Sequence, residues 1–202
     1  MLATRSAGKL RELRPIFADA GVRVIDLAEA GVAESPDEEA IENQETFEAN
    51  ALAKAHWFFA RCGGLDVIAD DSGLAVDALD GAPGVRSKRW SGRSDLHGHA
   101  LDEANNEQLV ARLRGVADRS ARFVCAAAWC GARGAVVTRG EHAGRILGSP
   151  SGTHGFGYDP YFFSDELGMT LADATTEEKR RVSHRGRAFD VLVERLRVLG
   201  VL

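Results

Sequence analysis

Apolar residues recur along the chain with two alternating periods, one typical of helices and one typical of strands. Helical spacing, as in Leu10, Leu13, Ile16 and Phe17, predicts helices over residues 10–20, 47–61, 101–113 and 189–199. Thr46 is a good N-cap for the second helix, whose inner face of Phe47, Ala51, Ala55 and Phe58 is interpreted as plain core. Thr175 and Glu178 fit a capping box that opens a further helix containing Lys179. Short apolar runs predict strands at residues 22–27, 66–71, 74–79, 122–129, 135–146 and 161–163, the two before the last forming a β-hairpin. Predicted helices and strands thus follow one another along the whole chain, with no internal repeat.

Two adjacent aspartates interrupt the apolar pattern near its centre. Asp70 and Asp71 separate Val67-Ile68 from Leu74-Ala75-Val76, and Ser72-Gly73 follows them. If the strand continues, its alternation directs the two carboxylates to opposite sides. Buried carboxylates need partners, and a metal ion, a cation or a helix N-terminus would serve. The alternative is an Asp-Asp-Ser-Gly turn whose short polar side chains bond the local backbone.

Size, composition and charge narrow the possible classes of protein. A chain of 202 residues can bury a core as one domain or as two lobes sharing a sheet, and 45% hydrophobic with 27% charged residues is ordinary for a globular protein. The net charge of −5, from 25 basic and 30 acidic residues, lacks the basic excess typical of proteins that bind duplex nucleic acid.

Cysteine usage and hydropathy predict a cytoplasmic protein. Cys62, Cys125 and Cys130 are odd in number and form no close metal-type pair, which argues against a disulfide framework and suits a reducing compartment. No apolar run approaches about 20 residues, so we expect no membrane span. The N-terminus carries no signal-peptide hydrophobic region.

Two ends of the chain carry groups suited to phosphates. The loop from Thr4 to Lys9 leads into the first predicted helix, whose N-terminus favours anions, and it supplies hydroxyls and a lysine. It lacks the glycine spacing of a Walker P-loop, and the alternative is a solvated loop with a surface lysine. Near the other end, Lys179, His184, Arg185 and Arg187 either gather phosphates or base edges or are simply exposed to solvent.

A glycine-rich loop at residues 148–160 carries two aromatic residues, Phe156 and Tyr158. Glycines let a flat ligand approach the backbone, and aromatic faces stack on bases. The alternative is a β-bulge with ordinary aromatic packing. A second cationic segment, residues 86–93 around Trp90, is more readily interpreted as surface.

These stretches together resemble the inosine/xanthosine triphosphate pyrophosphatase family. The family's opening, Ala-Thr-Gly-Asn-x-x-Lys, is similar to residues 3–9, and its Thr-Phe-Glu-x-Asn-Ala matches residues 46–51 behind an acidic segment that includes Glu42. Four further motifs stand intact: Ala-Asp-Asp-Ser-Gly-Leu at 69–74, Gly-Ala-Pro-Gly-Val at 81–85, Phe-Gly-Tyr-Asp-Pro at 156–160 and Ser-His-Arg-Gly-Arg-Ala at 183–188. Each motif alone is weak, but their order over nearly the whole chain is specific.

The resemblance implies a fold and an activity. The family fold is α/β, ITPase-like, with an elongated two-lobed architecture around a mixed, twisted central β-sheet. Residues 1–202 would form a single such domain with the active site in the cleft between the lobes. With Mg²⁺, the family hydrolyses noncanonical purine nucleoside triphosphates (ITP, dITP, XTP) to the monophosphate and pyrophosphate. This reaction removes the noncanonical nucleotides from the nucleotide pool. Members of the family are usually homodimers.

The resemblance also implies the site residues. Glu42 and Asp71 would hold Mg²⁺, and Asp71 would act as general base. The phosphates would lie near Ser72 and on residues 4–9, namely Thr4, Arg5, Ser6, Ala7, Gly8 and Lys9. The purine would lie on the Phe156-Gly157-Tyr158 stretch with Phe156 stacking on it. Its polar edge would be recognised by Asp159, His184 and Arg185, with Lys179 supporting the ligand.

Three residues depart from the family pattern, and two other functions stay open. Ser6 replaces the family asparagine, Arg5 replaces a small residue, and Gln44 stands where bacterial members often have glycine. One alternative is a related nucleotide pyrophosphatase of the Maf type, against which the intact motifs at 156–160 and 183–188 argue. The other is a nucleotide-binding sensor without hydrolysis, motivated by Ser6 alone.

Overall fold

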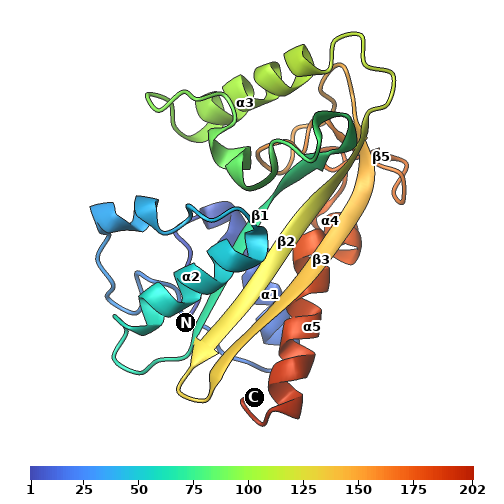
Figure 1. Cartoon of the computed structure of the whole chain (residues 1–202). Helices are drawn as coiled ribbons and strands as arrows, with labels where there is room; N and C mark the ends of the chain where they lie inside the picture. The colour runs from blue at the N-terminus through green and yellow to red at the C-terminus, as the bar shows by residue number, and fades with distance from the viewer. The chain divides into compact units, whose positions relative to one another are not determined.

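The computed structural model covers residues 1–202 and describes all of them except the side chain of Glu39. Five α-helices and five β-strands form its framework (Figure 1). The helices are α1 Ala7–Asp19, α2 Phe47–Phe59, α3 Gly98–Arg112, α4 Thr176–Val182 and α5 His184–Val198. The strands are β1 Val67–Val76, β2 Ser120–Gly131, β3 Gly134–Ile146, β4 Phe162–Ser164 and β5 Met169–Thr170. Short 3-10 helices span Pro36–Ala40, Asp77–Leu79 and Gly84–Arg89.

The five strands form one sheet in the order β1-β2-β3-β4-β5. Strand β4 pairs antiparallel with β3, with Phe162 opposite Ile146, and antiparallel with β5. Leu2 adds isolated parallel bridges to Asp26 and to Ile68. The α/β class predicted from the resemblance is therefore confirmed, with parallel and antiparallel pairing both present.

The chain divides into two compact units. The first contains residues 1–71, 125–140 and 184–202, and the second contains residues 72–124 and 141–183. Strands β1, β2 and β3 each contribute residues to both units. The candidate site residues are therefore distributed between the two units, and each group is described within its own unit.

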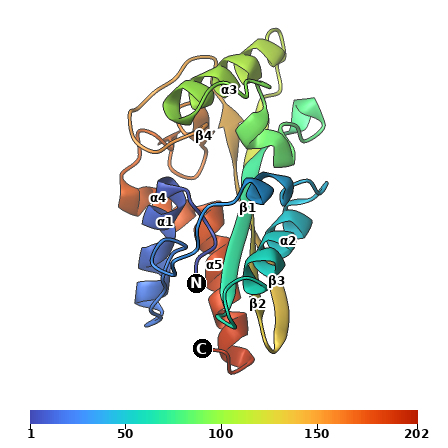
Figure 2. The ribbon, with the colours of Figure 1, turned by 90° about the vertical axis from the view of Figure 1, so that its left-hand side faces the viewer.

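In the first unit, helices cover both faces of the strands. Helices α1 and α5 lie side by side (Figure 2) and pack their apolar residues against Ile68 of β1 and against Cys125, Ala127 and Trp129 of β2. Because successive strand residues point to opposite faces, Cys130 lies on the other face, where its Sγ is 3.2 Å from Nδ1 of His56 in α2. Helix α2 begins at the predicted cap, Thr46, whose side chain accepts a hydrogen bond from the Ala49 N–H.

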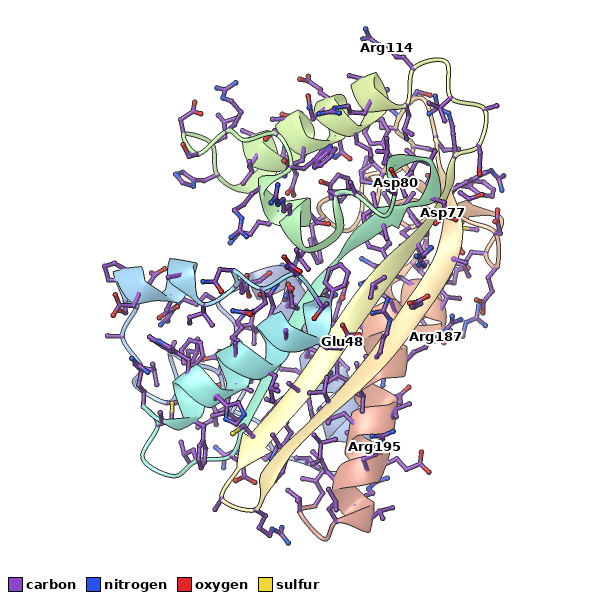
Figure 3. The ribbon with its side chains drawn as sticks, in the orientation of Figure 1. Glu48, Asp77, Asp80, Arg114, Arg187 and Arg195 are labelled. Atoms are coloured by element: carbon purple, nitrogen blue, oxygen red, sulfur yellow. The ribbon has the colours of Figure 1, made fainter. Side chains whose placement is uncertain are left out.

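The second unit has its own core, formed by apolar residues of α3 and of the strand segments that belong to this unit. Leu109 of α3, Phe123 of β2 and Phe162 of β4 are among its buried members. Helix α4 begins at the predicted capping box of Thr175 and Glu178. At the surface, Arg122 and Asp77 of this unit form an ion pair of 2.6 Å, as do Arg139 and Glu48 in the first unit. Figure 3 labels Asp77 and Glu48. Exposed pairs of this kind contribute little to stability.

Three of the predicted strands differ from those in the structure. The strands predicted at 66–71 and 74–79 are one continuous strand, β1, and no turn separates them. The strand predicted at 22–27 is reduced to the bridge at Asp26, where the chain turns because Asp26 and Glu29 bond each other's backbone N–H groups. Among the described helices, none is long and apolar enough to span a membrane.

Candidate functional site

The two adjacent aspartates lie inside β1, so strand alternation directs them to different faces. Asp70 shares its face with Ile68 and points to the α1 and α5 side, where it contacts Lys9 and Arg185. Asp71 points to the α2 side, where Asn50 Nδ2 donates to its Oδ2 at 2.9 Å. Both side chains are buried. The strand continuing through the Asp-Asp pair thus gives the two carboxylates separate environments, as the alternation predicts.

Asp70 is the centre of a buried network of charges. Its Oδ2 lies 3.0 Å from Lys9 Nζ and 3.3 Å from Arg185 Nε. Arg185 also forms an ion pair with Glu12, which lies one turn after Lys9 in α1. Burial alone would raise the pKa of Asp70, but the positive charges of Lys9, Arg185 and Lys54 lower its pKa well below the ordinary value. Asp70 is therefore ionised and holds the two cations in place.

Asp71 has the opposite electrostatic environment. Burial and the negative charge of Glu42 raise its pKa from 3.8 to about 6, although Lys9 and the Asn50 hydrogen bond act in the other direction. A carboxyl group with a pKa near neutrality can accept a proton in the physiological range. Asp71 thus has the protonation behaviour required of a general base.

Glu42 and Lys54 complete this side of β1. Lys54 Nζ, from α2, lies 2.6 Å from Glu42 Oε1. Burial would raise the pKa of Glu42, but Lys54 and Lys9 lower it, so this carboxylate is ionised. Burial would lower the pKa of Lys54, but Glu42, Asp70 and Asp71 raise it. Asn50 also fixes the segment around Glu42, because its Oδ1 accepts from the Gln44 N–H at 2.8 Å.

The pair of Glu42 and Asp71 fits a magnesium ion. The two carboxylates are near enough for Glu42 to raise the pKa of Asp71, so a divalent cation would relieve a repulsion present in the protein. The described residues contain no cluster of three or more His, Cys, Asp and Glu side chains arranged for a metal. Mg²⁺ typically uses one or two carboxylates and completes its shell with waters and substrate phosphates, whereas Zn²⁺ sites need three or four protein ligands.

The loop before α1 forms an anion-attracting helix N-terminus. Ser6 is the N-cap residue, and its Oγ accepts from the Lys9 N–H at 3.3 Å. Thr4 Oγ1 accepts from the Ser6 N–H at 3.2 Å. Ala7 and Gly8 are the first helical residues, where backbone N–H groups point out of the helix end. Ser6 thereby performs the capping that the family asparagine would also perform, because both residue types are good caps.

Arg5 is engaged by the protein itself. Its Nε and Nη2 form a two-bond contact with the Glu38 carboxylate at 2.8 and 2.7 Å, and Nη2 also donates to the Ala33 carbonyl at 3.0 Å. The side chain therefore ties the loop before α1 to the segment that precedes Glu42. Its role in substrate binding stays a prediction.

The second unit presents an aromatic residue held by a charged pair. Phe156 is 36% exposed, and its backbone N–H donates to Asp159 Oδ2 at 2.8 Å. Lys179 Nζ lies 2.7 Å from the same oxygen and 5.0 Å from the centre of the Phe156 ring. Asp159 is buried, so it serves first to hold Phe156 and Lys179. Gly155 is required here, because a Cβ at that position would collide with the Asp159 carboxylate.

The remaining predicted residues lie in less informative positions. Tyr158 is buried and donates from its hydroxyl to the Ser87 carbonyl at 2.8 Å, and burial raises its pKa well above the ordinary value. The neighbouring Gly157 has a φ of 63°, in the left-handed region that favours glycine. Ser72 follows Asp71 in β1 and is half-buried, and His184 is the buried first residue of α5.

The structure thus groups the predicted residues as two clusters. In the first unit, Lys9 and Arg185 contact Asp70, and Glu42 lies near enough to Asp71 to raise the pKa of that carboxyl group. In the second unit, Phe156, Asp159 and Lys179 contact one another.

Three residues that contact members of the first cluster were missed by sequence reasoning. Asn50 and Lys54 lie four residues apart in α2, whose inner face was interpreted as plain core from Phe47, Ala51, Ala55 and Phe58. Polar residues at this helical spacing beside a core stripe were the available signal. Glu12 carried no such signal, because its partner Arg185 lies 173 residues away.

Comparison with known proteins identifies the family to which the chain is similar. The model of the Ham1 family matches residues 1–195. The chain is 49% identical over 203 residues to the dITP/XTP pyrophosphatase of Mycolicibacterium paratuberculosis, with 99% of this chain and 96% of that protein covered. It is 46% identical over 205 residues to the dITP/XTP pyrophosphatase of Geobacter sulfurreducens, with 100% and 98% covered.

Solved structures give the same result. The Ham1 protein of Staphylococcus aureus matches with a TM-score of 0.81 and 36% identity, covering 97% of this chain and 96% of that one. The nucleoside-triphosphatase / dITP/XTP pyrophosphatase of Mycobacterium abscessus matches with a TM-score of 0.72 and 42% identity, covering 95% and 96%. Sequence and structure agree over nearly the full length, as the predicted resemblance requires, and the chain belongs to the Ham1 family.

Proposed function

We propose that the protein is a Mg²⁺-dependent nucleoside-triphosphate pyrophosphatase that removes noncanonical purine nucleotides such as dITP, ITP and XTP. One water molecule is consumed, the bond between the α- and β-phosphates breaks, and the products are the nucleoside monophosphate and pyrophosphate. The curated relatives carry the name dITP/XTP pyrophosphatase at 49% and 46% identity, which supports this activity.

The observation that carries the proposal is the contrast between Asp70 and Asp71. Asp70 is ionised and holds Lys9 and Arg185, so it serves as a fixed anion. Asp71, with its pKa raised to about 6, exchanges a proton near neutral pH. Two neighbouring carboxyl groups whose environments push their pKa values apart are typical of sites that carry out acid–base chemistry.

Asp71 is assigned the role of general base, which accepts a proton from the attacking water. Its ionised carboxylate accepts that proton as the water oxygen bonds to the α-phosphorus, and the departing group is pyrophosphate. The Asn50 amide orients the carboxylate by donating to Oδ2 at 2.9 Å. When bound by Glu42 and Asp71, Mg²⁺ supplies Lewis-acid charge for the phosphates.

The phosphate tail is assigned to the N-terminus of α1. Lys9, on the first turn, brings a cation, and the helix end and the Ser6 hydroxyl add hydrogen-bond donors. The ion pair between Lys9 and the buried Asp70 directs the ammonium group of Lys9 and limits its motion.

The purine is assigned to Phe156, whose ring is partly exposed and can stack on a base. Lys179 and Asp159 hold that ring, and Arg185 and His184 are assigned to the polar edge of the base. Arg185 can only donate hydrogen bonds, so it favours the 6-oxygen of hypoxanthine and xanthine over the 6-amino group of adenine. A homodimer is also proposed, and light scattering of the purified protein tests it.

Pyrophosphate release from dITP, ITP, XTP, GTP and ATP tests the proposal directly. We expect turnover of the first three with Mg²⁺ and none in excess chelator. Asp71→Asn is expected to reduce turnover by roughly 10²–10⁴-fold, the usual effect of losing a general base. Full turnover in chelator would contradict the two-carboxylate assignment, and tight nucleotide binding without hydrolysis would favour a sensor.

A further inference from the structure

Two polar residues of α3 hold the backbone next to the exposed aromatic ring. Asp102 Oδ2 accepts from the Gly157 N–H at 2.9 Å, and Asn106 Nδ2 donates to the Gly157 carbonyl at 2.9 Å. The two residues are four apart in the helix and therefore project from the same face. The backbone N–H and the backbone carbonyl of Gly157 are thus both held by helix α3.

Gly157 directly follows Phe156, and a glycine stands on each side of this aromatic residue. Gly155 and Gly157 have φ angles of 79° and 63°, a region that glycine enters without steric cost. The only described side-chain bond to the backbone of Phe156 is the one from its N–H to Asp159 at 2.8 Å. The carbonyl of Phe156 also accepts from the Asp159 N–H at 3.3 Å. The bonds from α3 therefore add an attachment outside this turn, at the residue that follows Phe156.

The state of Asn106 indicates what its amide is for. Asn106 is 6% exposed, and its Oδ1 has no hydrogen-bond partner within the described part of the chain. A buried acceptor without a partner is unfavourable, so leucine at this position would remove a destabilising group while it gives up the bond to Gly157. The feature that leucine could not replace is the bond from Nδ2 to Gly157.

We propose that Asp102 and Asn106 are positioning residues that hold Phe156 in the orientation needed to stack on the purine. The inference rests on the proposed function, because it assigns the base to Phe156. It adds that α3 determines affinity for the base while leaving the affinity for phosphates unaffected. A ring that must be ordered at the moment of binding loses affinity through conformational entropy, and a ring that is held beforehand does not.

The test compares two ligands that differ in having a base. Calorimetry with Mg²⁺ present measures Kd for inosine monophosphate and, separately, for pyrophosphate. We expect Asn106→Leu to weaken inosine monophosphate binding by roughly three- to tenfold, the effect of one neutral hydrogen bond, with Kd for pyrophosphate within about twofold. Thermal melting should show a Tm close to that of the parent, because leucine removes the unpaired Oδ1 as well as the bond to Gly157. Asp102→Ala should give the same selective loss, so the test does not depend on one variant folding.

Asn105→Leu is the matched control. Asn105 is equally buried on α3, but it bonds the Ser91 N–H and the Lys88 carbonyl and makes no described bond to Gly157. We expect it to lower Tm and to leave the ratio of the two Kd values unchanged. A selective loss in this control equal to that of Asn106→Leu would overturn the proposal, because it would reflect general loosening of α3.

A double-variant cycle with Phe156→Ala separates the inference from the proposed function. If Asn106 acts through the ring, Asn106→Leu has no further effect once Phe156 is alanine. The same fold-change in both backgrounds would overturn the positioning role while the base assignment stands. Unchanged inosine monophosphate binding in Phe156→Ala would overturn the base assignment and this inference with it.

Discussion

Replacing Asp71 by asparagine should stabilise the protein, whereas replacing Asp70 by asparagine should destabilise it. In the folded protein Asp71 keeps its proton up to a pH of about 6, because its pKa is raised to about 6 from an ordinary value of 3.8. Between these pH values the folded state binds more protons than the unfolded state, so the free energy of unfolding falls as pH rises. Above about pH 6 the ionised, buried carboxylate of Asp71 lowers the free energy of unfolding by its full amount. Asparagine at this position carries no charge and removes this loss of stability.

The size of the effect follows from the two pKa values. Their difference of about 2 corresponds to about 3 kcal/mol. Asp71 is 6% exposed, so solvent screens this penalty little. Asparagine can keep the bond from Asn50, because its amide oxygen also accepts. We therefore expect Asp71→Asn to raise the unfolding free energy by up to about 3 kcal/mol at pH 8, and to raise Tm by about 2–4 °C for each kcal/mol.

Asp70→Asn is the control with the opposite sign. This change leaves the cations of Lys9 and Arg185 without the carboxylate that they share, and breaking a buried ion pair costs about 3–5 kcal/mol. The pKa of Asp70 is lowered, so its stabilisation is complete above its unfolded pKa and is lost only as pH falls through the folded value. Its cost should therefore be nearly constant from pH 5 to pH 8.

Thermal melting of the parent and both variants in excess chelator, at half-unit steps from pH 4 to pH 8, provides the measurement. The gain of Asp71→Asn should grow between pH 4 and pH 6 and then level off. A gain that is absent at pH 8, or equal at all pH values, would refute the reasoning. Adding Mg²⁺ should stabilise the parent more than Asp71→Asn, because a ligand stabilises the state that binds it.

Three further predictions concern departures from the family and the recognition of the base. Ser6→Asn should leave turnover similar or higher, as steady-state kinetics would show. Ser6→Ala should weaken substrate binding by about 0.5–1.5 kcal/mol, and it should lower the unfolding free energy by about 1 kcal/mol through loss of the α1 cap. Kinetics measures the first of these two effects, and thermal melting measures the second. Arg185→Ala should reduce kcat/KM selectively for ITP and XTP over ATP, and equal loss on all nucleotides would show that Arg185 serves only the Asp70 and Glu12 network. Arg5→Ala should increase proteolysis at residues 32–38, since Arg5 binds the Ala33 carbonyl and Glu38; an unchanged digestion rate would contradict this.

Elements with local signals were predicted well from the sequence. Thr46 caps α2, and Thr175 with Glu178 forms the capping box of α4, because caps act within one turn and are visible in the sequence. The alternation that separates Asp70 from Asp71 is also a local property of a strand, and it holds in the structure.

The continuity of β1 was missed because its cause is tertiary. Gly73 was interpreted as a turn residue, yet it lies within the strand, where a Cβ would collide with Ser87 and with the Gly84 carbonyl. Ser87 Oγ in turn accepts from the Leu74 N–H at 2.8 Å. The glycine therefore serves the close approach of residues 84–87, a segment that sequence spacing does not connect with it.

Lys9 and Arg185 both contact the carboxylate of Asp70, which links the positions of these two cations in the first unit. One carboxylate oxygen lies 3.0 Å from Lys9 Nζ and 3.3 Å from Arg185 Nε, and Glu12 returns from Arg185 to the helix that carries Lys9. In a buried network the strength of each bond depends on the others, so removing one member changes the rest. The lysine assigned to phosphates and the arginine assigned to the base therefore have linked positions and charges. Because Asp70 is held ionised by both, it fixes the two cations on one face of β1, and the neighbouring Asp71 is left on the other face to exchange a proton.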